Sequence, residues 1–185
     1  MKNKMPTINC SRFILREIKK EDYLDYFFIG SDFETTKYLT WGPFEEPSQA
    51  LFALEKFYLN RNLFNLPNAY AIVLKRTDEV IGLIEFHTYF PHENSAEIGF
   101  LLRSDYQGKG IMTEALNQMI KLGFEYLELD KIIVGHVDVN LACKNLVKKC
   151  GFKYEYVKYC AFSDKETALP RDIVYYSIYK NEVLL

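Results

Sequence analysis

The residues with the clearest chemical potential lie around a short loop, Gln107-Gly108-Lys109-Gly110. Two glycines this close let backbone N–H groups crowd together, and a helix that starts after them leaves its first N–H groups unpaired. Such a helix N-terminus binds phosphate oxygens. An ordinary turn before a helix fits the glycines alone, because short glycine motifs are common. The loop lacks the third glycine of a dinucleotide fingerprint and the Gly-Lys-Ser/Thr of a P-loop.

Charged side chains on two adjacent predicted strands could move a proton. Glu97 lies ahead of the loop, and a carboxylate partly removed from water has a raised pKa, better suited to accept a proton at neutral pH. Glu85 and His87 share one face of the preceding strand, because both are odd-numbered in a pattern of period two. Glu97 is therefore the first candidate base, with Glu85 and His87 in reserve, acting directly or through water. A Glu97 that bonds a neighbouring strand or solvent fits the sequence equally well.

The spacing of the apolar residues predicts the elements that position this loop. Residues 95–102 alternate as in a strand, and after Gly110 the apolar residues recur at three and four up to Leu127, as on one face of a helix. With no repeat or linker, we expect one mixed α/β domain over residues 1–185. Other strands are expected at 12–18, 70–74, 80–89, 131–137, 152–162 and 172–179, and other helices from Lys20, at 32–39, at 49–60 with Ser48 as a cap, and at 140–149 before Gly151.

Composition and charge exclude several classes of function. The chain has 185 residues, of which 49% are hydrophobic and 26% charged, as in ordinary globular domains. Its net charge of −2 implies no general affinity for nucleic acid. Neither a membrane-spanning stretch nor a signal peptide is apparent, so we expect a cytoplasmic protein without a membrane partner. The four cysteines form no Cys-x-x-Cys pair and the three histidines show no metal spacing, so we expect reduced thiols and no metal.

Two blocks of the sequence resemble the GNAT superfamily of N-acetyltransferases. The loop at Gln107 resembles that family's Gln/Arg-x-x-Gly-x-Gly/Ala signature, although Met112 stands where the signature has Gly or Ala. The segment from Asn140 to Phe152 resembles the family's helix that starts at Asn and ends in Lys-x-Gly-Phe. The resemblance implies an α+β fold with a mostly antiparallel twisted sheet of about six to seven strands flanked by helices. It also implies acetyl-CoA as the cosubstrate, bound by Phe100, Leu101, Leu102, Gln107, Gly108, Lys109, Gly110, Ile111, Met112, Asn140 and Lys144.

The N-terminal part of the chain resembles a narrower group. The segments 12–16, 21–22 and 37–41 look like the ribosomal-protein N-terminal acetyltransferase branch, which also includes enzymes acting on other small amines. This likeness implies an acetyl-CoA-dependent N-acetyltransferase whose acceptor is a protein N-terminal α-amine or a small amine. Trp41, Glu85 and His87 would contact that acceptor, in a monomer or a homodimer.

The proton donor and the competing functions stay open at this level. In the family, a backbone N–H near Phe100 or Leu101 would meet the oxyanion. Many members place a Tyr seven residues after the Asn, but Val147 stands there and cannot donate a proton. Cys143, where the ribosomal branch often has Ser, could donate one, and a buried structural cysteine is an equal alternative. A non-catalytic acyl-CoA-binding module is the competing function, whereas the charge and the absent P-loop motif argue against a nucleotide-binding protein.

Overall fold

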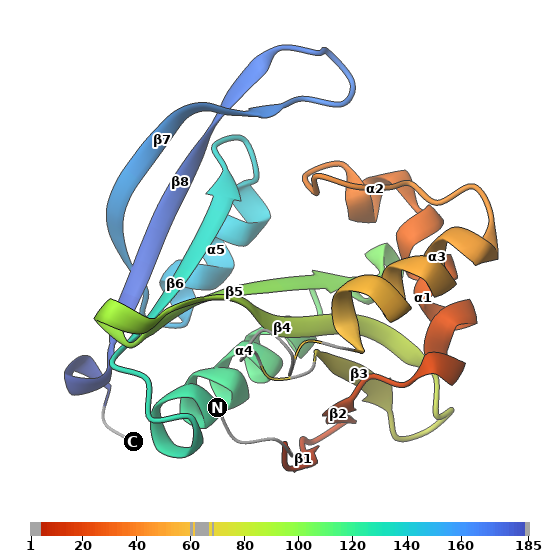
Figure 1. Ribbon diagram of the computed structural model, residues 1–185, viewed down its shortest axis with the longest axis horizontal. Coiled ribbons are helices and arrows are strands. Elements are labelled where there is room, and N and C mark those ends of the chain that lie inside the picture. The colour runs from red at the N-terminus through yellow and green to blue at the C-terminus, as the bar shows by residue number, and fades with distance from the viewer. Residues whose placement is uncertain (1–4, 60, 62–66, 68, 184–185) are drawn as a thin grey trace.

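The fold is built on one mixed, eight-stranded sheet, and the computed structural model describes residues 5–59, 61, 67 and 69–183 (Figure 1). The strand order is β1-β2-β3-β4-β5-β6-β8-β7, and every neighbouring pair is antiparallel except β5 and β6. The expected mostly antiparallel α+β fold is therefore confirmed, and the two-residue strand β1 raises the strand count above the expected six to seven. The strands are β1 Ile8–Asn9, β2 Phe13–Glu17, β3 Tyr70–Leu74, β4 Val80–Phe90, β5 Ser95–Leu102, β6 Lys131–Val137, β7 Lys153–Ser163 and β8 Pro170–Tyr179.

The helices differ from the sequence predictions mainly at their ends. The helix expected at 32–39 is only α2, whose first turn is capped by the Asp32 carboxylate accepting the Glu34 N–H. Ser48 is not the cap of α3, because that helix starts two residues earlier than predicted, with Pro47 at its first position and Glu46 as the N-cap. Its predicted end at Asn60 lies outside the described residues. The α-helices are α1 Tyr23–Ser31, α2 Phe33–Thr36, α3 Pro47–Ala53, α4 Ile111–Lys121 and α5 Leu141–Lys149.

Shorter helical turns extend or connect these elements. Two π-helical turns, η2 Leu54–Tyr58 and η6 Leu122–Tyr126, continue α3 and α4, so the apolar stripe predicted up to Leu127 includes a change of helix type. Among the helices of the described residues, none combines the length and the apolar character needed to cross a bilayer. The 3-10 turns are η1 Lys20–Asp22, η4 Pro91–Glu93, η5 Ser104–Tyr106 and η7 Lys180–Glu182.

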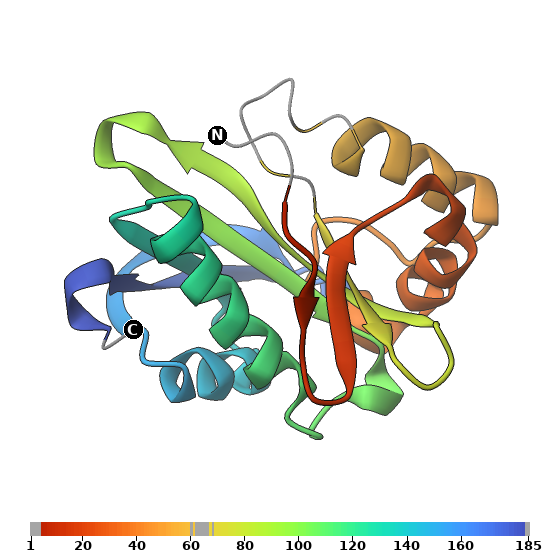
Figure 2. The ribbon, with the colours of Figure 1, turned by 90° about the horizontal axis from the view of Figure 1, so that it is seen from below.

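The sheet is covered on both faces, and each face has its own apolar core. In the middle of β4 and along β5, even-numbered residues such as Phe86 and Ile98 pack with α4 and with Val147 of α5. Figure 2 shows α4 and α5 side by side on this face. Odd-numbered residues, such as Leu83 and Leu101, pack with α1, α3 and η2 on the opposite face. The alternation read from the sequence therefore decides which side chains of β4 and β5 face which helices.

One departure from regular pairing matters for function. β5 and β6 pair only from Ser95 to Glu97 with Lys131 to Ile133, whereas β5 continues to pair with β4 as far as Leu102. Beyond Glu97, one edge of β5 therefore has no strand partner among the described residues. The backbone groups on that edge are left to bind something other than a strand.

Candidate functional site

A cleft of about 1020 Å³ occupies the place where β5 and β6 separate. It opens toward both faces of the sheet, because its lining comes from β4, β5 and β6, from the start of α4 and α5, and from the segment after α2. Most of the predicted site residues meet here. The predicted residues in its lining are Trp41, Glu85, His87, Phe100, Leu101, Leu102, Gln107, Gly108, Gly110, Ile111, Met112, Asn140 and Cys143.

The loop between β5 and α4 has the conformation that an anion site needs. Gly108 and Gly110 have φ angles of +69° and +77°, which favour glycine. The Glu114 N–H donates to the carbonyl of Gly110, which is the first hydrogen bond of the helix. The N–H groups of residues 111–113 precede this bond and have no partner within the helix. A phosphate at this helix start would accept these N–H groups and meet the positive end of the helix dipole.

The N-terminal strands brace this loop. The Arg12 Nη2 donates to the carbonyl of Lys109 at 2.8 Å. The Ser11 backbone N–H and hydroxyl donate to the Glu114 carboxylate at 2.7 and 2.8 Å. The turn between β1 and β2 therefore holds both the loop and the first turn of α4, a contact about a hundred residues apart in sequence.

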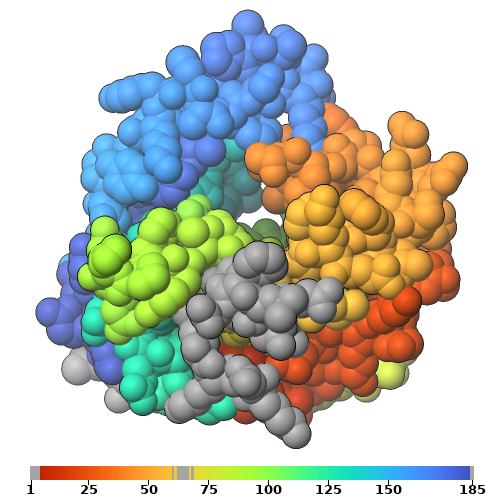
Figure 3. All heavy atoms as spheres, viewed as in Figure 1, coloured from red at the N-terminus to blue at the C-terminus, as the bar shows by residue number. Residues whose placement is uncertain are grey.

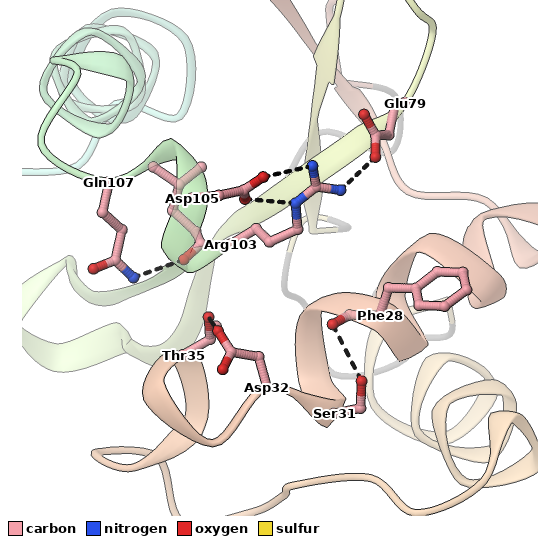
Figure 4. A network of polar contacts seen from close by, with 9 residues as sticks. Phe28, Ser31, Asp32, Thr35, Glu79, Arg103, Asp105 and Gln107 are labelled. Atoms are coloured by element: carbon pink, nitrogen blue, oxygen red, sulfur yellow. Dashed lines mark hydrogen bonds and ion pairs between the residues drawn. The ribbon is translucent and has the colours of Figure 1, made fainter.

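A second polar network fixes the end of β5 ahead of the loop (Figure 4). The Arg103 guanidinium donates to both oxygens of Asp105, at 2.7 and 2.9 Å, and also pairs with Glu79. The Gln107 Nε2 donates to the carbonyl of Leu102 at 2.9 Å, so this side chain holds the loop to the strand. Bonds of this kind preorganise a loop before its ligand arrives, which lowers the ordering cost of binding.

The start of α5 forms the opposite wall. Asn140 is the N-cap of α5, and its Oδ1 accepts the Cys143 N–H at 3.0 Å. Burial raises the pKa of the Cys143 thiol to about 12, so it stays protonated at neutral pH. Lys109 and Lys144, which we expected to bind the cofactor, are not among the residues that line the cleft in the described part of the chain.

On the α2 side of the cleft, β4 carries a buried ion pair. Arg61 pairs with Glu85, and these side chains are only 6% and 15% exposed. The Arg61 Nη2 also donates to the carbonyl of Phe86 at 2.8 Å. Burial lowers the pKa of Arg61 to about 10, which still leaves it charged at neutral pH. The Glu85 carboxylate is therefore already neutralised from inside the protein.

His87 lies in a β-bulge, where the pairing of β4 with β5 shifts between Phe86 and Thr88. Its imidazole fits over Gly99, where a Cβ would come within 2.9 Å of the His87 Cδ2. Its Nδ1 lies 2.9 Å from the Thr88 hydroxyl. Burial, together with the nearby Arg61 charge, lowers the pKa of His87 to about 4, so the imidazole is neutral at neutral pH.

Glu97 stands at the last paired position before β5 leaves β6. Its Oε1 lies 3.7 Å from His87 Nε2 and would lie 3.2 Å from a Cβ placed on Gly135. Desolvation raises the pKa of Glu97, against the opposing effect of Lys158. Its side chain is 18% exposed, and although it is not among the cleft-lining residues, it contacts the edge of the cleft through His87. The structure therefore brings Glu97 and His87 together across β4 and β5, a contact that the alternation within one strand did not predict.

Comparison with known proteins agrees with this architecture. A family model described as an acetyltransferase (GNAT) domain matches residues 12–153. This chain belongs to the GNAT acetyltransferase family. It is 32% identical over 180 residues to an uncharacterized N-acetyltransferase of Bacillus licheniformis, over 96% of this chain and 98% of the relative. It is 28% identical over 146 residues to spermidine N(1)-acetyltransferase of Vibrio cholerae, over 78% of this chain and 81% of the relative.

A solved structure shows the same fold at low sequence identity. RimL, a ribosomal L7/L12 α-N-protein acetyltransferase in complex with coenzyme A, matches with a TM-score of 0.83 at 17% identity, over 94% of this chain and 98% of that chain. Together with the family match, this confirms the prediction of an N-acetyltransferase that uses acetyl-CoA as its acetyl donor. The membership argues against a non-catalytic acyl-CoA sensor and against a nucleotide-binding protein. It leaves the amine acceptor undetermined.

Residues that GNAT sequence patterns did not point to also shape this site. Arg61, the partner of Glu85, is 24 positions away from it in sequence. The rings of Tyr156 and Tyr175 stack with their centroids 4.6 Å apart, and Tyr175 and Glu97 both approach Gly135. No local spacing links these residues to Glu97, since only the register of β6, β7 and β8 brings them to the same face.

Trp41 lines the cleft and is also anchored in the core. Its ring stacks on that of Phe44 at 5.0 Å and packs against that of Tyr26 at 5.7 Å between centroids, and its contact with the acceptor stays a prediction. The turn at Pro91 is absent from the lining within the described residues. Asn94 instead ties that turn to Asp130, with Nδ2 donating at 3.0 Å.

Proposed function

We propose that this GNAT enzyme acetylates the α-amine of a peptide or protein N-terminus. The observation that carries the proposal is the charge balance on the α2 side of the cleft. Glu34 pairs with Lys37 at 2.6 Å, Glu85 pairs with Arg61, and Glu97 lies in the field of Lys158. A polyamine needs several unpaired carboxylates, whereas a single amine needs one group that can take its proton.

Glu97 is the proposed proton acceptor. Its raised pKa narrows the gap to an α-amine, whose pKa is about 7.7–8.0. The neutral His87 beside it does not repel the incoming ammonium group, and its lowered pKa makes it a weaker proton acceptor than Glu97. Glu85 is the less suitable base, because its charge is already paired with Arg61.

The acetyl group would lie along the unpaired edge of β5. There a backbone N–H near Phe100 or Leu101 could donate to the thioester oxygen as it becomes an oxyanion. The amine nitrogen attacks the thioester carbonyl carbon, the C–S bond breaks, and coenzyme A leaves as a thiolate. The pyrophosphate would meet the N–H groups at Gly108, Gly110 and Ile111, with Asn140 and Cys143 beside the arm of the cofactor.

Proton transfer from Cys143 to that thiolate would be energetically unfavourable. Its pKa of about 12 compares with about 8.5 for an ordinary thiol, so the transfer is uphill by about 5 kcal/mol. We therefore favour release of coenzyme A without a dedicated acid over proton donation by Cys143, because the thiolate is stable enough to leave and then take a proton from water.

The test is a comparison of acceptors by coenzyme A release. The panel contains short lysine-free peptides with a free α-amine, N-acetylated peptides that keep one lysine, and spermidine. We expect the free α-amine peptides to have the highest kcat/KM. A higher kcat/KM for spermidine or for the blocked lysine peptides would reject the α-amine acceptor and leave the acetyl-CoA-dependent activity intact.

A further inference from the structure

The turn between β7 and β8 reaches across to the segment that follows α2. The Lys165 ammonium on this turn donates to three backbone carbonyls, those of Thr36 at 2.9 Å, Trp41 at 2.5 Å and Gly42 at 2.9 Å. Three hydrogen bonds are the full donor capacity of a lysine. The residues it joins are more than 120 positions apart in sequence, so this contact connects two separate parts of the fold.

The turn that carries Lys165 is internally ordered. The Asp164 Oδ1 accepts the N–H groups of Glu166 and Thr167 at 3.0 and 2.9 Å, and its Oδ2 accepts the Arg171 Nε at 3.3 Å. These bonds fix the backbone on both sides of Lys165. Lys165 therefore lies on a turn whose conformation is fixed by its own hydrogen bonds.

The segment that Lys165 holds is part of the cleft wall. Residues 37–41 line the cleft, and Trp41 is anchored on its other side by Phe44 and Tyr26. Figure 1 shows the β7–β8 hairpin reaching toward α2, and Figure 3 shows an opening bounded by that hairpin and the α2 segment. Lys165 thus holds the β7–β8 turn against a segment that includes part of the cleft wall.

We propose that Lys165 is a specificity-determining residue, which clasps the β7–β8 turn to residues 36–42 and closes the acceptor opening into a ring. The ring admits the amine at the end of a slender, extended chain and excludes amines on bulky ring systems. The role of Lys165 rests on the proposed function, because it requires an amine acceptor that enters from the α2 side. The clasp itself is a structural contact that can be tested without any activity.

The first test uses hydrogen exchange in three proteins: wild type, Lys165→Met and Lys165→Arg. Methionine keeps the length of the side chain and removes its donors, whereas arginine keeps the charge and the donors. The reporters are the amides of Leu39 and Phe44, which donate to the carbonyls of Thr36 and Gly30 at 2.9 Å each. The reference is the Arg103 amide, which donates to the Ile81 carbonyl at 2.9 Å.

Lys165→Met should speed exchange at the two reporters by roughly tenfold or more, because hydrogen bonds to a charged group are strong. The Arg103 amide should exchange at its wild-type rate, and Lys165→Arg should restore most of the protection. Unchanged exchange at Leu39 and Phe44 in Lys165→Met overturns the clasp.

The second test measures specificity with a free α-amine peptide and with kanamycin as a bulky amine. In wild type the peptide should have the higher kcat/KM, and Lys165→Met should narrow the ratio by about fivefold or more at an unchanged KM for acetyl-CoA. An equal change for both acceptors overturns the specificity role. If the wild-type protein releases no coenzyme A with any amine, both the proposed function and the specificity role are rejected. The hydrogen-exchange result then tests only the Lys165 contact.

Discussion

Replacing Glu97 with Gln should slow acetylation by an amount that depends on the pKa of the acceptor amine. Glutamine keeps the shape of the side chain in the space over Gly135 but cannot take a proton. The variant must then rely on the neutral fraction of the amine. At pH 7 this fraction is roughly one tenth for an α-amine with a pKa near 8, and about one in 2,500 for a lysine amine with a pKa near 10.4.

The expected loss in kcat/KM is therefore about tenfold for a peptide α-amine and on the order of 10³ for a lysine amine. In each case the loss should shrink as the pH approaches the pKa of the amine. The assay is coenzyme A release between pH 6.5 and pH 9 at saturating acetyl-CoA. Glu125→Gln makes the same substitution at an exposed position on η6, and it should behave as wild type.

The same substitution has a second consequence, for stability. Desolvation raises the pKa of Glu97 in the folded state, so the folded state binds the proton more tightly than the unfolded state. Stability is then lost as the pH rises from the unfolded pKa to the folded pKa, and the loss persists at neutral pH. Glu97→Gln should therefore melt at a higher temperature than wild type at pH 7. This difference should vanish below the ordinary glutamate pKa of about 4.3.

The combination of slower turnover and higher stability separates a buried catalytic base from a structural carboxylate. A structural Glu97 bonded to its neighbours would instead lose stability when it is replaced. Wild-type turnover at pH 7 would move the base role to Glu85, His87 or water. Equal losses for the two kinds of amine would refute the reasoning based on acceptor pKa.

Further predictions concern the residues around Glu97 and the cofactor loop. Gly135→Ala would place a Cβ 2.9 Å from the Tyr175 ring and 3.2 Å from the Glu97 carboxylate, so kcat should fall by about tenfold while calorimetry finds the acetyl-CoA Kd unchanged. Gly110→Pro cannot adopt the φ of +77° at this position, so the acetyl-CoA Kd should rise by about tenfold or more in a folded variant. Cys143→Ala should change kcat by less than about threefold, because a thiol with a pKa of about 12 is a poor acid; a hundredfold loss would restore it as the proton donor.

The sequence predicted the elements whose apolar residues follow a regular period. Residues 131–137 and the central strand alternate or run apolar over enough positions to define strands, and the helix after Gly110 has a full apolar stripe. Strand β1 has only two residues, which is too short for any period to be recognised. The helix at 32–39 was predicted too long because its polar residues fit both a helix and the turns that follow α2.

The candidate site was predictable to the extent that it depends on short spacings. The glycines of the loop, the Asn140 cap and the shared face of Glu85 and His87 all follow from residues close together in sequence. The charge state of Glu85 does not, because it depends on Arg61, whose side chain arrives from outside the sheet. Lys165 gave no signal either, since a lysine in a charged turn looks like an ordinary solvated residue until the turn is placed against α2.

The separation of β5 from β6 explains why the cleft is lined from both faces of the sheet. If the two strands stayed paired beyond Glu97, the sheet would be continuous there and no passage would connect its two faces. Their separation leaves a passage lined from both faces, with the loop at residues 107–110 and α5 on one side and residues 37–41 on the other. In the proposed function, acetyl-CoA and the amine would approach from opposite sides of the sheet. Glu97, the proposed base, stands at the last paired position, where the passage begins. It lies on a strand still held by both neighbours, and proton transfer to a positioned amine would require this rigidity.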